Sequence, residues 1–214
     1  FERAGRELHS GYDLKTARRS MNLLTIEWAN RGINMWTIDE GFINLVQGTS
    51  TYDLPAATID LIEQVIRTGA GSTTLQSDLN LSRISVSTYS SVPNKLTQGR
   101  PIQVWVDRLR DNPTVTVWPV PDRGTAIAPY YILRYWRLRR IENAGAGVET
   151  PDMNFRFFPA LVSGLAYYIA TKIPELFPRV EMLKSQYEEQ YALAAGEDRE
   201  KASISLVPRI YGVS

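Results

Sequence analysis

The sequence contains no cysteine, and His9 is its only histidine among 214 residues. The absence of cysteine excludes disulfides, thiolate zinc sites and cysteine nucleophiles. A single histidine excludes metal sites built from several histidines, and it permits a Ser-His-Asp triad only if His9 folds back onto a distant site. A lone histidine between helices is more often an ordinary solvated side chain than a catalytic one.

Long apolar runs and a strong net charge are also lacking. No stretch approaches the roughly 18 apolar residues of a membrane span, and no signal peptide is recognisable, so we expect no membrane partner. The 24 basic and 23 acidic residues leave a formal charge of +1. A dedicated nucleic-acid-binding protein normally lies well above neutrality. The chain begins at Phe1 rather than Met, and we expect a piece to precede it.

Motifs that carry chemistry are missing as well. There is no Walker motif, dinucleotide glycine fingerprint or EF-hand loop, and the glycine-rich stretch 69–72 lacks the lysine of a phosphate-binding loop. The paired carboxylates at Glu188 and Glu189 fit the solvated face of a helix, and those at Asp53 and Asp60 fit turn caps. We predict that the protein is not an enzyme and needs no cofactor or metal.

What is present begins with helical periodicity. Apolar residues spaced three and four apart predict an amphipathic helix over 13–31, with Asp13 as its N-cap and Gly32 as its stop. A second apolar face starts at Phe158 and ends before Pro174. A third helix is predicted over 178–201, with a stripe of apolar residues and charge elsewhere, so it lies on the surface or along a partner. The stripe consists of Val180, Leu183, Tyr187, Tyr191 and Ala194.

Between these helices, short alternating runs separated by turn residues predict strands. The expected strands are rich in β-branched and aromatic residues, and they cover 42–46, 61–67, 102–106, 114–118 and 130–136. Most of the five tryptophans are expected in the core. The fold class is therefore α+β, a helical bundle with an inserted small antiparallel β-domain and an extended C-terminal tail. Its expected parts are 1–35, 36–140, 141–201 and 202–214.

The charge is unevenly distributed along the chain. Residues 100–140 carry eight arginines and three aspartates, a net of +5, whereas 175–200 carry seven acids and three bases, a net of −4. Regions of opposite charge can meet within one chain or between copies. The side chains that we expect at a subunit interface or channel are Arg134, Arg137, Arg139, Arg140, Glu181 and Glu188.

Two other functions remain open at this point. Arginines interleaved with aromatic residues over 130–140 can bind single-stranded nucleic acid by stacking and phosphate contact. The alternative reading is a strand whose aromatic side chains are core and whose arginines extend to an interface. A carbohydrate-binding tail component is also consistent with exposed Trp and Tyr.

Several stretches in order resemble one known family. They are ARRSMNLL at 17–24, EWANRGINMWT at 27–37, YDLP at 52–55, GRP at 99–101, VWPVPD at 117–122, FFPALV at 157–162 and GLAYY at 164–168. Together they resemble the head-to-tail adaptor, or tail tubular protein A, of podovirus-type phages. The resemblance spans nearly the whole chain, with an N-terminus that is short relative to that family.

The resemblance implies a structural role without chemistry. In that family, twelve copies would form a ring beneath the portal protein, close the head-to-tail connection after packaging and dock the tail nozzle protein. DNA would pass through the channel only as cargo. The protein would then assemble in the host cytoplasm and reside in the tail of the virion. Such a ring is a heterologous, closed assembly in which each copy presents two different complementary patches.

The resemblance also implies that the C-terminal tail reaches into the portal. Residues 202–214 contain no acid and are apolar enough to lie in a groove of a partner. The portal-interface residues that we expect are Ile204, Leu206, Val207, Pro208, Arg209, Ile210 and Tyr211.

Overall fold

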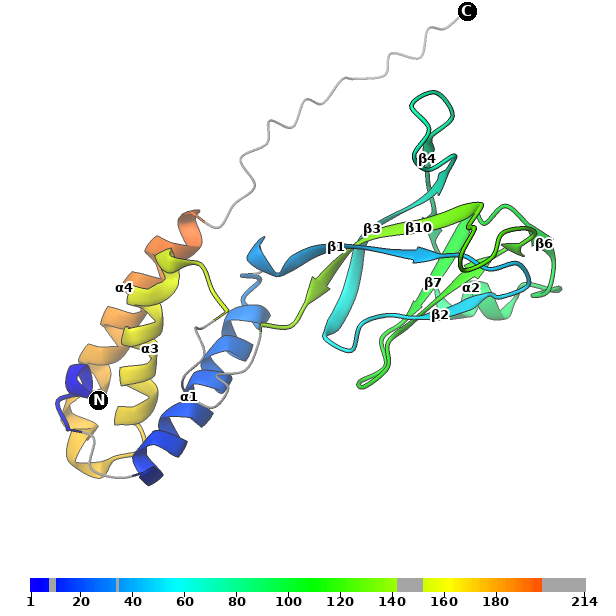
Figure 1. Ribbon diagram of the computed structural model, residues 1–214. Helices are drawn as coiled ribbons and strands as arrows, with labels where there is room; N and C mark the ends of the chain where they lie inside the picture. The colour runs from blue at the N-terminus through cyan, green and yellow to red at the C-terminus, as the bar shows by residue number, and fades with distance from the viewer. Residues whose placement is uncertain (8–10, 34, 142–151, 198–214) are drawn as a thin grey trace, which may run out of the picture. The chain divides into compact units, whose positions relative to one another are not determined.

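The computed structural model describes residues 1–7, 11–33, 35–141 and 152–197 (Figure 1). The chain divides into two compact units. The helical unit combines Phe1–Met35 with Asn143–Ser214, and the β unit is Trp36–Glu142. The fold is therefore mixed α+β, and the β unit is inserted in sequence between two helical segments.

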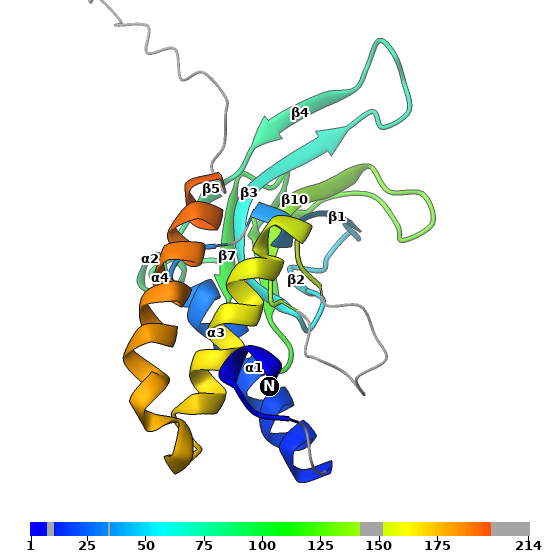
Figure 2. The same cartoon turned by 90° about the vertical axis from the view of Figure 1, so that its left-hand side faces the viewer.

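The helical unit contains α1 (Gly11–Asn30), α3 (Phe158–Ala170) and α4 (Val180–Glu197). Short 3-10 turns flank them: η1 (Glu2–Ala4), η3 (Phe155–Phe157) and η4 (Pro174–Arg179). Helix α3 packs against both α1 and α4. It lies between them and runs in the opposite direction, so α1 and α4 point the same way on its two sides (Figures 1 and 2).

The sequence pattern explains where α1 ends. Gly32 adopts a left-handed conformation with φ of 84°, which a glycine reaches without steric cost. The N–H of Gly32 donates to the carbonyl of Ala29, and the N–H of Ile33 donates to that of Trp28. This is a Schellman motif, and it satisfies carbonyls that the last turn leaves unpaired. The predicted stop at Gly32 is confirmed.

All three helices meet at Gly164 of α3. A Cβ at this position would lie 2.8 Å from the ring of Tyr187 in α4 and 2.9 Å from a methyl group of Leu24 in α1. Both neighbours are fully buried. Glycine is required here because its missing side chain lets both neighbouring helices pack directly on the α3 backbone.

We expect Gly164→Ala to destabilise the protein. Overpacking a filled core costs about 1–3 kcal/mol, which outweighs the gain of about 1 kcal/mol that alanine brings to a helix. The matched control is Gly196→Ala in α4, where a Cβ would meet nothing within 4 Å. That control should leave the free energy of unfolding unchanged or raise it. Urea denaturation followed by circular dichroism measures both, and an unchanged midpoint for Gly164→Ala would contradict this account.

The β unit contains two four-stranded sheets. The first has the order β1 (Ile38–Asn44), β10 (Tyr131–Arg139), β3 (Thr58–Thr68), β4 (Ser77–Asn80), and all its pairs are antiparallel. The second has the order β2 (Thr51–Asp53), β8 (Thr114–Trp118), β7 (Gln103–Asp107), β5 (Ser82–Arg83). A short pair joins β6 (Gln98–Gly99) to β9 (Val120–Pro121), and η2 (Met35–Thr37) precedes β1.

Both sheets contribute to one core. The alternating pattern of β10 sends Tyr131, Leu133 and Tyr135 inward. They meet valines of the second sheet, namely Val104, Val106, Val115 and Val117. The ring of Tyr135 lies over its cross-strand neighbour Gly41, where a Cβ would come within 2.5 Å of the ring. The predicted strands 114–118 and 130–136 correspond to β8 and to most of β10.

The structure differs from the sequence expectation at several points. Helix α2 (Val86–Ser90), capped by the side chain of Ser85, was not predicted. The β unit is not wholly antiparallel, because β5 pairs with β7 and β6 with β9 in parallel over two residues each. A register shift opposite Trp136 lets Ile62 and Glu63 both face outward, so the alternation expected for the strand over 61–67 is interrupted there. Of the five tryptophans only Trp28 is completely buried.

Candidate interaction surfaces

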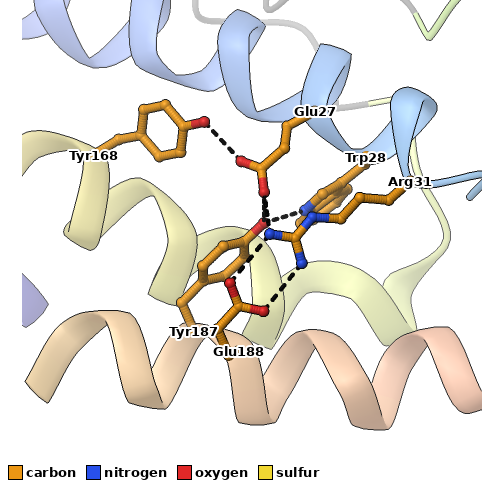
Figure 3. A network of polar contacts seen from close by, with 6 residues as sticks. All are labelled: Glu27, Trp28, Arg31, Tyr168, Tyr187 and Glu188. Carbon is orange, nitrogen blue, oxygen red and sulfur yellow. Dashed lines mark hydrogen bonds and ion pairs between the residues drawn. The ribbon is translucent and has the colours of Figure 1, made fainter. Parts of the chain in front are cut away.

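A polar network joins the three helices of the helical unit (Figure 3). The indole N–H of Trp28 donates to the hydroxyl of Tyr187 over 2.9 Å, and that hydroxyl donates to Glu27 Oε1 over 3.1 Å. The hydroxyl of Tyr168 in α3 donates to the other carboxylate oxygen of Glu27 over 2.6 Å. Glu27 therefore accepts from α3 and α4 at once, and Trp28, 0% exposed, has its only polar atom satisfied.

Arg31 extends this network to the surface of α4. Its guanidinium contacts Glu27 over 2.5 Å and donates to both carboxylate oxygens of Glu188 over 3.0 and 3.1 Å. It also stacks on Tyr191 with 4.5 Å between the guanidinium carbon and the ring centre. A bidentate arginine–carboxylate pair is both strong and directional. The C-terminal end of α1, with Arg31 directly after it, is thus bound to the middle of α4.

Burial changes the ionisation of the tyrosines in this network. Burial raises the pKa of Tyr168 to about 12, and its hydrogen bond to Glu27 acts in the same direction. Burial likewise raises the pKa of Tyr187 above its ordinary value. Both hydroxyls therefore remain protonated at neutral pH. Each can then donate a hydrogen bond to the carboxylate of Glu27, which only accepts. The network therefore holds the three helices together, because both hydroxyls are used in hydrogen bonds within the helical unit.

We expect Tyr187→Phe to destabilise the helical unit by about 1–3 kcal/mol, because the buried indole N–H of Trp28 then lacks its acceptor. The measurement is the free energy of unfolding in urea. Tyr12→Phe is the matched control, since Tyr12 is 73% exposed and should tolerate loss of its hydroxyl. Equal free energies of unfolding for the two variants would show that the hydroxyl of Tyr187 does not stabilise the fold.

The ion pair between α1 and α4 predicts a pH dependence. The hydrogen bonds from Arg31 hold the pKa of Glu188 below its usual value of 4.5. A carboxyl group whose pKa is lower in the folded protein stabilises the fold above the unfolded-state pKa, and this contribution is lost as the pH falls through the folded-state pKa. We therefore expect the urea concentration at the unfolding midpoint to decrease when the pH is lowered below about 4.5.

Glu188→Gln should flatten this dependence, since no carboxylate remains to be protonated. Glu189→Gln is the control, because the neighbouring Glu189 is exposed and forms no ion pair with the described part of the chain. It should keep the wild-type profile. An identical acid profile for wild type and Glu188→Gln would exclude the pair as its origin.

The predicted interface arginines of β10 already have partners within the β unit. Arg134 pairs with Glu40 of β1. Arg137 and Arg139 both contact Asp39 of β1, over 3.2 and 3.0 Å. These carboxylates lie on the adjacent strand, where the register of β1 against β10 brings them alongside. Two carboxylates from outside 100–140 therefore contact three of its eight arginines, so those three do not form a free basic surface.

The remaining predicted residues are distributed over both units. Arg140 is exposed at the end of β10, and its backbone N–H donates to Ala57. Glu181 is exposed in the first turn of α4, whereas Glu188 is committed to Arg31. Arg140 belongs to the β unit, and Glu181 and Glu188 belong to the helical unit. The predicted portal-interface residues 204–211 and His9 lie outside the described residues.

One exposed surface was missed by sequence reasoning. Ile127 is 97% exposed at the tip of the loop before β10. The turn that carries it is held by hydrogen bonds between Thr125 and Ala128 in both directions, over 3.1 and 3.0 Å. The side chain of Asn44 donates to the carbonyl of Ala126 over 3.0 Å and ties the loop to β1. A braced loop that displays an apolar side chain is suited to docking on another surface.

The described ranges show neither a metal-binding cluster nor a membrane-spanning helix. Among residues 1–7, 11–33, 35–141 and 152–197, no group of three or more histidine, aspartate or glutamate side chains is placed to hold a metal ion. Within those same ranges, no helix combines the length and apolar character needed to cross a membrane.

The comparisons with known proteins identify the family. The family model described as SU10 adaptor protein matches residues 2–209, nearly the whole chain. No curated protein matches the sequence significantly. The match places the chain among phage structural adaptors, a class of assembly proteins and not of enzymes. The chain belongs to the SU10 adaptor protein family. Membership points to interaction with other phage structural proteins and to a place in the virion.

Proposed function

We propose that this adaptor forms a ring in the head–tail connector of its phage, between the portal protein and the tail nozzle protein. The match to an adaptor family over 2–209 carries this proposal. In it, the helical unit is the bundle that builds the ring wall, twelve copies close the ring, and DNA passes through the central channel. Assembly takes place in the host cytoplasm and ends in the tail of the virion.

Exposed apolar side chains in both units support a role in assembly. Large apolar residues at least half exposed occur in α1 and α4 of the helical unit and at loop tips of the β unit, for example Leu23, Leu193, Leu75 and Ile127. In our proposal these side chains contact partner proteins in the assembled connector. In our proposal the loop tips of the β unit face the nozzle.

The C-terminal residues are the proposed contact with the portal. Residues 202–214 combine several large apolar residues with Arg209 and no acid. A short apolar segment gains affinity by adding backbone hydrogen bonds and filling pockets of its partner. The proposed contacts are Ile204, Leu206, Val207, Pro208, Arg209, Ile210 and Tyr211.

Deleting 203–214 should abolish binding to the portal protein of the same phage and leave the helical content unchanged. Native mass spectrometry of the full chain, alone and mixed with portal, supplies the reference, and we expect a high-order complex with portal. The control replaces the apolar residues of the tail with serine at constant length, which should weaken binding similarly. Undiminished binding after the deletion would refute the tail assignment, and no complex with the full chain would refute the adaptor assignment.

The structure does not favour the nucleic-acid alternative. A single-strand-binding surface presents arginines and aromatic faces together to solvent. In β10, Tyr131 and Tyr135 are buried in the core, while Arg134, Arg137 and Arg139 contact carboxylates of β1. The strand therefore matches the alternative reading in which its aromatic side chains are core.

A further inference from the structure

The outer surface of α1 combines apolar and basic side chains. Residues spaced three and four apart point away from the buried face that holds Leu24 and Trp28. We call this surface the α1 flank, and it consists of Tyr12, Lys15, Arg19, Leu23 and Ile26. Tyr12, Leu23 and Ile26 are 73%, 51% and 52% exposed. Its two charges are both positive, and neither forms an ion pair with the residues that the structure describes.

The outer surface of α4 is a counterpart of opposite sign. It lies away from the buried residues Leu183, Tyr187 and Ala194. We call it the α4 flank, and it consists of Glu181, Met182, Ser185, Glu189 and Leu193. Met182 and Leu193 are 46% and 64% exposed. Both of its charges are negative, and in the described chain neither takes part in an ion pair.

The two flanks cannot meet within one copy. Helix α3 lies between α1 and α4 (Figures 1 and 2). Each flank lies opposite the buried face of its own helix, and that buried face is the one turned toward the other helices. Each copy therefore carries a basic apolar surface on one side of its helical unit and an acidic apolar surface on the other. Two different complementary patches on one chain are what a head-to-tail, heterologous contact needs.

The flanks also match in register. Helices α1 and α4 run in the same direction (Figure 1), and neighbours in a ring of twelve differ by a rotation of only roughly 30°. Helix α1 of one copy can therefore lie nearly parallel to α4 of the next. One common offset then places Tyr12 beside Met182, Arg19 beside Glu189 and Leu23 beside Leu193. The α1 flank and the α4 flank therefore match each other in both charge and residue spacing, which favours a second copy of this chain as the partner.

We propose that neighbouring copies join through these surfaces, with the α1 flank of one copy packed on the α4 flank of the next. The inference rests on the proposed ring and names its contact. Charge complementarity between Arg19 and Glu189 sets the register, while the apolar pairs supply the buried surface. This contact differs from a pairing of the β10 arginines with α4, which would have to break the ion pairs of Arg134, Arg137 and Arg139.

Charge reversal tests the contact. Arg19→Glu and Glu189→Arg are each expected to reduce the ring fraction, measured by native mass spectrometry with portal present, by about tenfold or more, since like charges then face each other. A mixture of the two variants should restore rings, because every contact in an alternating ring is again between opposite charges. Lys184→Glu is the control, as Lys184 is exposed on α4 but outside the flank, and it should assemble normally.

A cross-link tests the geometry independently of ring stability. The chain has no native cysteine, so the double variant Leu23→Cys, Leu193→Cys carries the only thiols. At high protein concentration, oxidation should give a ladder of covalent multimers. The single variant Leu23→Cys should stay monomeric, because Leu23 meets Leu193 in the contact and not a second Leu23. The control is the double variant Leu14→Cys, Leu193→Cys, because Leu14 is on α1 but outside the flank. It should give about tenfold fewer covalent multimers, or fewer still, than the double variant Leu23→Cys, Leu193→Cys.

The outcomes separate the contact from the ring itself. Intact rings in both charge-reversal variants, or equal ladders from the two cysteine pairs, would overturn the contact and leave the ring proposal standing. Loss of rings in the single variants without rescue in the mixture would also overturn the assigned pairing. Wild-type protein that stays monomeric with and without portal would overturn both proposals.

Discussion

The packing of the helical unit depends on the hydroxyl of Tyr187, which bonds α4 to two residues of α1. Burying a tryptophan completely requires an acceptor for its indole N–H, and Trp28 has this one within 2.9 Å. The same hydroxyl donates to Glu27, which also accepts from Tyr168. One acid of α1 is thereby bonded to both other helices. Gly164 supports the arrangement, because only a residue without a side chain lets Leu24 and Tyr187 approach α3 so closely.

This constraint determines which surfaces remain for partners. Because the faces of α1 and α4 that carry Trp28 and Tyr187 are turned inward, the opposite faces are left in solvent. Those faces hold charges of opposite sign on the two sides of α3. In the ring that we propose, the hydrogen bonds of the inner network have a direct use, because a ring closes only if every copy holds its two contact surfaces at the same angle.

The β unit shows how tertiary pairing changes the meaning of a charged segment. Read along the chain, 100–140 is strongly basic, and it suggested an interface or a DNA-facing strand. In space, β1 lies beside β10 and brings Asp39 and Glu40 against Arg134, Arg137 and Arg139. Charges far apart in sequence cancel locally, so a net charge counted over a window cannot locate a basic surface.

Local patterns in the sequence were sufficient for the longer elements. The helix ending at Gly32, the apolar stripe of α4 and the strand over 114–118 follow from periodicity and turn residues, which act within a few positions of the chain. Helix α2 was missed because its five residues span little more than one turn, too short for periodicity to appear. The bulge at Ile62 was missed because it depends on the register against β10.

By itself, the sequence determined the α+β class and the resemblance to a phage adaptor. Those conclusions depend on residue types and their order. The tertiary structure alone decided which charges are paired and which remain available. Arg31 and Glu188, or Arg137 and Asp39, meet only because distant segments pack together. The energy of a charge depends on what lies within a few ångströms of it, and the chain's order does not specify those neighbours.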